Sequence, residues 1–322
     1  MPMRAIVLGS AAGGGFPQWN CGCSNCMAVR QGRPGYSART QDSLALTSSV
    51  DPLSGRFVLV NASPDVLAQI RATRPLWPRE PRHSPIGAIV LTNGDLDHVL
   101  GLFSLRESYP LALYSTASVR RGLEASAFIR TLRRFEGQLV MRDIVLGSAI
   151  ELRDAAGNSL GLTMTASPMA GKLPVHFEGR ADATPEDNIA LSLRGDHGGT
   201  LMYAAAGASA DVDLAGHDVV LFDGTFFYED ELVKLGLSKA YARDMAHVPM
   251  GGPSGSLARL SKLRARKIYT HINNTNPILA PDSAERRWVE AAGWEIAFDG
   301  MEIVVDDSPS AIAYERKDAS LP

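Results

Sequence analysis

Four side chains that bind metals or move protons lie within six positions of this sequence. They are Asn93, Asp95, Asp97 and His98, in the stretch LTNGDLDHVLGL at positions 91–102. A turn after a strand often uses an Asp or Asn to cap the next helix, and Asn93 and Asp95 fit that structural role. Two carboxylates and an imidazole together are also a ligand set for a transition metal. The rest of the chain has to decide between these two interpretations.

All three cysteines, Cys21, Cys23 and Cys26, also lie within six positions of one another. An odd number of cysteines so close together does not suit a secreted disulfide framework. In a reducing compartment, C-x-C-x-x-C supplies three thiolate ligands for a structural Zn²⁺. The alternative is three unrelated buried thiols. We predict a zinc site that is remote from catalysis and takes its fourth ligand from elsewhere in the chain.

The composition is that of an ordinary globular protein of 322 residues, 45% hydrophobic and 21% charged, with a net charge of −3. No polybasic segment suggests binding to nucleic acid or to a membrane surface. No apolar run approaches the roughly 20 residues that span a bilayer. Residues 1–15 read as a strand entering a Gly-rich turn, not as a signal peptide. We therefore expect a cytoplasmic protein, with a homodimer as one open possibility and with neither nucleic acid nor membrane as a partner.

The elements that must position these residues can be read from apolar periodicity. Helical spacing is found at 64–73, 97–108, 116–135, 229–236, 255–266 and 282–293. Apolar runs closed by Gly, Asn, Asp or Ser predict strands at 4–10, 43–49, 56–63, 86–94, 111–115, 148–154, 160–167, 188–195, 200–207, 218–224, 266–272 and 294–305. Strands come in groups separated by helices, which favours two packed sheets with helices outside. We expect one domain over 1–305 and an irregular C-terminal tail over 306–322.

A strand, a turn that carries ligands and a helix, in that order, resemble the metallo-β-lactamase superfamily. Its H-x-H-x-D-H signature reads N-x-D-x-D-H here, from Asn93 to His98. The stretch YTHINN matches the late strand that ends in a metal-binding His, here His271, and AHVPMGG carries His247 where phosphodiesterases of the superfamily keep a catalytic His. The resemblance implies an α+β fold, the four-layer αβ/βα sandwich, with the site where both sheets end.

The departures from the superfamily pattern concern one of its two metals. Asn93 and Asp95 replace the two His of the first site, SPMAGK lacks the family's mid-chain His, and YAAAG lacks its bridging Asp. The resemblance leaves Asp97, His98 and His271 as ligands of a second site. Two imidazoles and one carboxylate form the facial triad typical of non-haem Fe(II) oxygenases, although Zn or Mn would also bind. Asn93 and Asp95 would then belong to the catalytic site as groups that orient His98 or the substrate, with metal ligation or helix capping as the alternatives.

Further residues have more open roles. His247 lies before a Pro-Gly-Gly loop and is expected at the mouth of the site as an acid or base or as a contact to the substrate, with a core histidine as the alternative. Asp223 closes a buried strand and is expected either to line the site or, at least as readily, to serve in a turn. By resemblance, Asn274 takes the place of a fourth zinc ligand, with another His or water as alternatives. The glycines Gly13–Gly15 suggest close backbone approach near the site. We expect ordinary surface or loop positions for His83, His176, Asp196, His197 and His217.

Four blocks narrow the resemblance to one family within the superfamily. GSAAGGGFPQWNCGCSNC, NGDLDH, HVPMGG and THINNTNPIL span residues 9–279 and are similar to the family that acts in making the redox cofactor pyrroloquinoline quinone (PQQ). The resemblance implies Fe(II)- and O₂-dependent hydroxylation of the tyrosine ring in a cross-linked Glu–Tyr precursor. The alternatives are a soluble carrier that moves PQQ or its precursor towards the periplasm, and a residual metallohydrolase with one metal.

Overall fold

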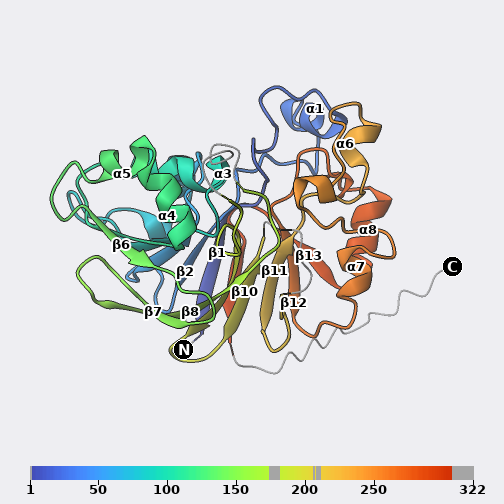
Figure 1. Ribbon diagram of the computed structural model, residues 1–322. Coiled ribbons are helices and arrows are strands. Elements are labelled where there is room, and N and C mark those ends of the chain that lie inside the picture. The colour runs from blue at the N-terminus through green and yellow to red at the C-terminus, as the bar shows by residue number, and fades with distance from the viewer. Residues whose placement is uncertain (1, 174–181, 206, 208–211, 307–322) are drawn as a thin grey trace.

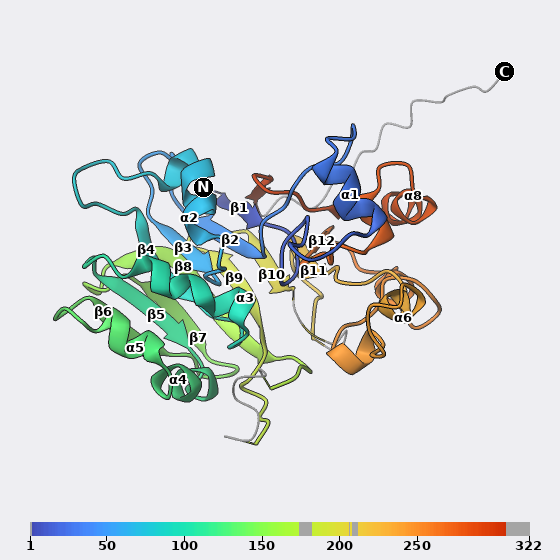
Figure 2. The ribbon, with the colours of Figure 1, turned by 90° about the horizontal axis from the view of Figure 1, so that it is seen from above.

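Two seven-stranded sheets face each other in this computed structural model, which describes residues 2–173, 182–205, 207 and 212–306. Helices cover the outer face of each sheet: α4 (Ala117–Glu124) and α5 (Ala127–Leu132) lie outside one sheet, and α7 (Ser256–Arg259) and α8 (Ala284–Ala291) outside the other (Figures 1 and 2). The predicted four-layer αβ/βα sandwich is confirmed.

The first sheet has the strand order β14-β1-β2-β3-β4-β5-β6. Strands β3 to β6 are parallel, and β14, β1, β2 and β3 pair antiparallel. Parallel neighbours need a crossover connection, which α2 (Val66–Ala72) and α3 (Leu96–Val99) help to form. The bounds are β1 Met3–Gly9, β2 Ser43–Thr47, β3 Phe57–Val60, β4 Ile86–Val90, β5 Leu111–Ser115, β6 Leu139–Asp143 and β14 Glu302–Val305.

The second sheet has the order β13-β12-β11-β10-β9-β8-β7. Strands β10 to β13 are parallel, and β7 to β10 form antiparallel pairs. The turn between β9 and β10 forms a hairpin that carries Asp196 and His197. The bounds are β7 Ala149–Arg153, β8 Ser159–Pro168, β9 Ile189–Gly195, β10 Thr200–Ala204, β11 Val219–Asp223, β12 Arg266–Thr270 and β13 Trp294–Ile296.

The layers are held together by three apolar clusters. One lies between the sheets and joins side chains of both, such as Val90 of β4 and Leu221 of β11. The other two lie between each sheet and its outer helices. Burial of apolar surface contributes about 25 cal/mol per Å² to the free energy of folding. Since the clusters cover both faces of each sheet, each sheet is stabilised from both sides. Among the described residues, no helix is long and apolar enough to cross a membrane.

The predicted helices are shorter in the structure. The expected helix at 116–135 is divided into α4 and α5 because the side chain of Ser126 caps a new helix by accepting from Phe128 N. The stretch 97–108 forms α3 followed by the 3₁₀ helix η2 (Leu100–Leu105). The other helices of the described residues are α1 Ser24–Arg30, α6 Glu231–Lys234, η1 Arg74–Leu76, η4 Arg243–Met245 and η5 Pro277–Leu279. Strand β6 and helix α1 were missed in the sequence. The expected tail lies, from 307 on, outside the described residues.

Candidate metal centre

The candidate centre lies where parallel strands of the two sheets end at the same edge. Strand β4 ends at Val90 before the turn into α3, and β12 ends at Thr270 before His271. A cavity of about 770 Å³ opens at this edge and is lined by Asp95, Asp97, His247 and His271. Gly13 also lines it, and a Cβ there would lie 3.2 Å from Oδ2 of Asp97. The expected close backbone approach is therefore present at Gly13.

The structure brings together the triad Asp97, His98 and His271. Their ligand atoms lie within 4.8 Å of one another. Nε2 of His271 is 3.4 Å, and Nε2 of His98 3.9 Å, from Oδ2 of Asp97. Ligand atoms at about 2.1 Å from a shared ion lie roughly 3–3.5 Å apart. The three residues therefore fit one metal ion with little movement, although Asp97 and His271 are 174 positions apart in the sequence.

The hydrogen bonds of His98 test whether its free nitrogen suits a metal. Nδ1 of His98 lies 2.8 Å from Oδ1 of Asn93, an oxygen that can only accept, so Nδ1 carries the proton. Nε2 of His98 is buried and has no hydrogen-bond partner among the described residues. A buried polar nitrogen without a partner is costly. A metal at Nε2 would satisfy it, so the residues fit the ion that the fold implies.

Charge in the triad favours a cation. Burial raises the pKa of Asp97, but His98 and His271 outweigh burial and hold that pKa well below its usual range. Burial lowers the pKa of His271, but its hydrogen bond to Asp97 and the charge of Asp97 raise it overall, to about 9. Without a metal, His271 thus carries a proton that neutralises Asp97. Metal binding must displace that proton.

Asn93 and Asp95 have different positions. Asn93 is 1% exposed, and its Oδ1 accepts from Asp95 N at 3.0 Å as well as from His98. It does not line the cavity, and its contact with Nδ1 of His98 fits the expected role of a residue that orients His98. Asp95 lines the cavity and begins α3 without a side-chain capping bond. Burial, then the charge of Asp97, raises the pKa of Asp95.

His247 lies in the same cavity, with its side chain 16% exposed. Its Nδ1 is 2.8 Å from Oδ2 of Asp223, which is fully buried at the end of β11. Its ring stacks on His271 with 5.6 Å between centroids. His247 is therefore not a core histidine, and Asp223 has a role beside the site and not merely in a turn.

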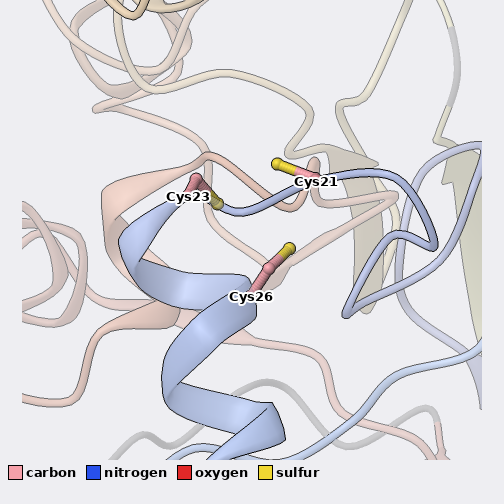
Figure 3. A group of neighbouring side chains, drawn as sticks. All are labelled: Cys21, Cys23 and Cys26. Carbon is pink, nitrogen blue, oxygen red and sulfur yellow. The ribbon is translucent and has the colours of Figure 1, made fainter.

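The three cysteines form a second cluster, in which the sulfur atoms lie within 4.8 Å of one another. Cys23 directly precedes α1 and Cys26 lies in it, while Cys21 approaches from the preceding loop, so that the thiols face a common point (Figure 3). The amide nitrogen of Asn274 lies 3.3 Å from Sγ of Cys26 and 3.7 Å from Sγ of Cys23. An amide rotated by 180° would place its oxygen at that point. The position of Asn274 thus suits a fourth ligand.

The cysteine cluster is not remote from the triad. Cys21 and Cys23 line the same cavity as His271, and Asn274 follows His271 by three residues. The expectation of a remote zinc site was wrong, because a long loop brings α1 across the edge where β12 ends. Sequence reasoning also missed an apolar wall of this cavity, which is formed by Phe226, Leu232, Leu235, Leu237 and Met245. No motif marks these residues.

Other expected histidines lie outside the candidate centre. The side chain of His83 accepts from Arg79 N at 3.2 Å, and His217 pairs with Ser192 at 2.8 Å. Neither residue lines the cavity, and neither does His197 or Asp196, which belong to the hairpin turn. His176 lies outside the described residues.

Comparisons with known proteins agree on one family. The beta-lactamase superfamily domain matches residues 56–272. The coenzyme PQQ synthesis protein B of Methylobacterium nodulans is 42% identical over 307 residues, which cover 93% of this chain and 99% of that protein. The protein of the same name from Rhizobium meliloti is 42% identical over 308 residues, with 94% and 97% coverage.

Solved structures give the same result. The crystal structure of Zn²⁺-bound PqqB from Methylobacterium extorquens has a TM-score of 0.84 and 37% identity, and the match covers 93% of this chain and 99% of that one. A diphosphatase of the PhnP family, with a TM-score of 0.65, 23% identity and coverage of 95% and 99%, shares the fold. The chain belongs to the coenzyme PQQ synthesis protein B family of the beta-lactamase superfamily.

Proposed function

We propose that this protein acts in PQQ biosynthesis as an Fe(II)- and O₂-dependent hydroxylase of the tyrosine ring in a cross-linked Glu–Tyr precursor. Relatives named coenzyme PQQ synthesis protein B support the pathway. The observation that carries the reaction class is the cluster of Asp97, His98 and His271. Two imidazoles and one carboxylate are the ligand set of non-haem Fe(II) oxygenases, and Fe(II) held there supplies the activation of O₂ that ring hydroxylation needs.

The surroundings of the triad support one metal over two. A two-metal hydrolase holds its nucleophile between the ions. Here, Oδ1 of Asn93 is occupied by His98, and the described residues after β10 that face this edge include Gly207. From the mid-chain loop the cavity is lined by Gly171 and Lys172, neither of which is an imidazole or carboxylate. Among the described residues, Asn93, Gly171, Lys172 and Gly207 offer no imidazole or carboxylate for the first metal of the superfamily, which argues against a residual two-metal hydrolase.

The lining of the cavity suits an aromatic amino-acid derivative. Phe226, Leu232 and Leu237 form part of an apolar wall, against which a phenol ring would pack. Lys172 also lines the cavity and would pair with a substrate carboxylate. A volume of about 770 Å³ falls within the usual range for small-molecule sites. A dipeptide-sized precursor, or PQQ itself, is therefore of suitable size.

His247 would handle the proton of the phenol. Because Nδ1 bonds to Asp223, the nitrogen left for the substrate is Nε2. A neutral imidazole with a free Nε2 can accept the phenolic proton and return it. Hydroxylation places one oxygen atom of O₂ on the ring and reduces the other to water, so two electrons must come from an external reductant. The nearby cysteine cluster would hold Zn²⁺ and shape the cavity wall, and the PqqB relative binds Zn²⁺.

The test is a reconstitution in the absence of air. Metal-free protein with zinc restored at the cysteines is loaded with Fe(II), then mixed with O₂, ascorbate and a cross-linked Glu–Tyr compound. Mass spectrometry should show the gain of one oxygen atom per hydroxylation. His98→Ala and zinc in place of iron are the matched controls, and neither should give product.

The same experiment separates the alternatives. Stoichiometric binding of the Glu–Tyr compound or of PQQ without any change of mass would overturn the hydroxylase and favour a carrier. Product formed equally by the His98→Ala variant would show that the triad does not carry the reaction.

A further inference from the structure

Asp223 contacts both histidines of the cavity, one directly and one through a threonine. The carboxylate is fully buried at the end of β11. Its Oδ2 lies 2.8 Å from Nδ1 of His247. Its Oδ1 accepts from the backbone N of Thr225 at 3.0 Å and from the Thr225 hydroxyl at 2.5 Å. Each carboxylate oxygen is therefore engaged.

The hydroxyl of Thr225 extends this chain to His271. Nδ1 of His271 lies 2.9 Å from Oγ1 of Thr225. A hydroxyl has one proton to donate. The carboxylate of Asp223 at 2.5 Å is a stronger acceptor than the backbone oxygen of His271, which lies 3.0 Å away. Thr225 thus donates to Asp223 and accepts from Nδ1 of His271.

We propose that Asp223 and Thr225 are positioning residues that hold His271 and His247 in one tautomer, with the proton on Nδ1 and the lone pair of Nε2 directed to the cavity. In His271 this lone pair is the one that would bind the metal, and in His247 it is the one that would face the substrate. One buried carboxylate thereby couples the metal ligand to the proton acceptor. The inference rests on the metal role of His271 in the proposed function.

The geometry does not suit Asp223 as a metal ligand itself. Ligand atoms of Asp223, His247 and His271 lie within 4.8 Å of one another, which resembles a third metal cluster. However, both oxygens of Asp223 accept hydrogen bonds, and its side chain has no exposed surface. The backbone supports an orienting role, because His271 has a φ of 55°, a left-handed conformation rare outside glycine that its surroundings must hold.

The test compares Thr225→Val with Thr225→Ser, because serine keeps the hydroxyl and valine keeps the shape. The cysteine site is first filled with zinc, and the Kd of Co²⁺ for the triad is measured by competition with a chelator. Loss of a group that orients a metal-bound His typically weakens binding by about 10–100-fold. We expect that loss for Thr225→Val and for Asp223→Asn, and an affinity close to wild type for Thr225→Ser and for His247→Gln.

Two further measurements separate orientation from general damage. The double variant Asp223→Asn/Thr225→Val should have the same Co²⁺ affinity as whichever single variant binds Co²⁺ less tightly. The reason is that Asp223 and Thr225 act through one chain of hydrogen bonds. In the wild type with zinc bound at both the cysteine cluster and the triad, ¹H–¹⁵N spectra of the imidazoles should show His247 and His271 protonated at Nδ1. Thr225→Val should lose this pattern at His271 and keep it at His247.

Wild-type Co²⁺ affinity together with an unchanged imidazole pattern in Thr225→Val would overturn the inference. If that variant loses the cysteine-bound zinc and so fails to fold, Asp223→Asn and the spectra of the wild type decide. His271→Ala tests the underlying proposal separately. If it binds Co²⁺ as tightly as wild type, the triad itself is wrong, whereas a large loss in His271→Ala with none in Thr225→Val rejects the orienting chain alone.

Discussion

The buried carboxylate of Glu231 should make the stability of this protein fall as the pH rises. Glu231 is 5% exposed at the start of α6, the helix that supplies part of the apolar cavity wall. Its oxygens accept from Phe227 N at 2.9 Å and from Oγ1 of Thr275 at 2.6 Å. Burial, only partly offset by these bonds, raises its pKa from 4.5 to about 7.

The sign follows from which state releases its proton first. Above pH 4.5 the unfolded chain ionises at this residue while the folded chain still holds the proton, so the free energy of unfolding decreases until the pH passes about 7. At about 1.4 kcal/mol per pH unit, this difference in pKa corresponds to about 3 kcal/mol in total. About 2 kcal/mol of it falls between pH 5.5 and 8, where the cysteine-bound zinc can be kept saturated.

Glu231→Gln removes the titration and keeps the size of the side chain. Urea unfolding at pH 5.5 and pH 8 should show that the stability of the variant relative to wild type improves by about 2 kcal/mol across this range. Glu290→Gln is the control, because Glu290 lies on the exposed face of α8 in an ion pair with Arg286, and exposed pairs contribute little. If the difference between Glu231→Gln and wild type stays constant with pH, the explanation by burial is wrong.

Three further predictions concern the two metal clusters. His98→Ala should lose the triad metal while the cysteine-bound zinc remains. Asp95→Asn should lose much less of the triad metal if Asp95 only lines the cavity. Metal analysis after dialysis measures both variants, and equal losses would make Asp95 a ligand. Asn93→Ala should weaken Co²⁺ binding at the triad by about 10–100-fold, because Nδ1 of His98 loses its acceptor. Asn93→Asp keeps an acceptor oxygen and should bind Co²⁺ nearly as well as wild type. Equal Co²⁺ affinities for the two variants would refute the orienting role of Asn93. Cys23→Ser should remove about one zinc per chain and lower the melting temperature, because structural zinc contributes folding free energy. Since Cys23 lines the cavity, binding of the Glu–Tyr compound should also weaken. An unchanged zinc content would contradict the assignment of a zinc site to the three cysteines.

Local sequence was sufficient for those features that depend on neighbours along the chain. Short apolar runs closed by Gly, Asn, Asp or Ser predicted most strands, because a strand that is buried on both faces needs apolar side chains on each. The clustered cysteines predicted a zinc site, since six residues suffice to bring three thiols together. Short elements were harder: β6 was missed, and the break between α4 and α5 depends on one capping hydroxyl, Ser126. The fold class came from the resemblance and from the order of strands and helices.

The arrangement of the candidate centre was decided by tertiary structure. No local pattern places Oδ2 of Asp97 3.4 Å from Nε2 of His271, because that distance depends on how the two sheets pack against each other. The shared cavity of the cysteine cluster and the triad, and the chain from Asp223 through Thr225 to His271, depend on the same packing. The sequence determined which residues have the chemistry to bind metals. Their distances and hydrogen bonds were decided by contacts between distant segments, which burial of the common core fixes.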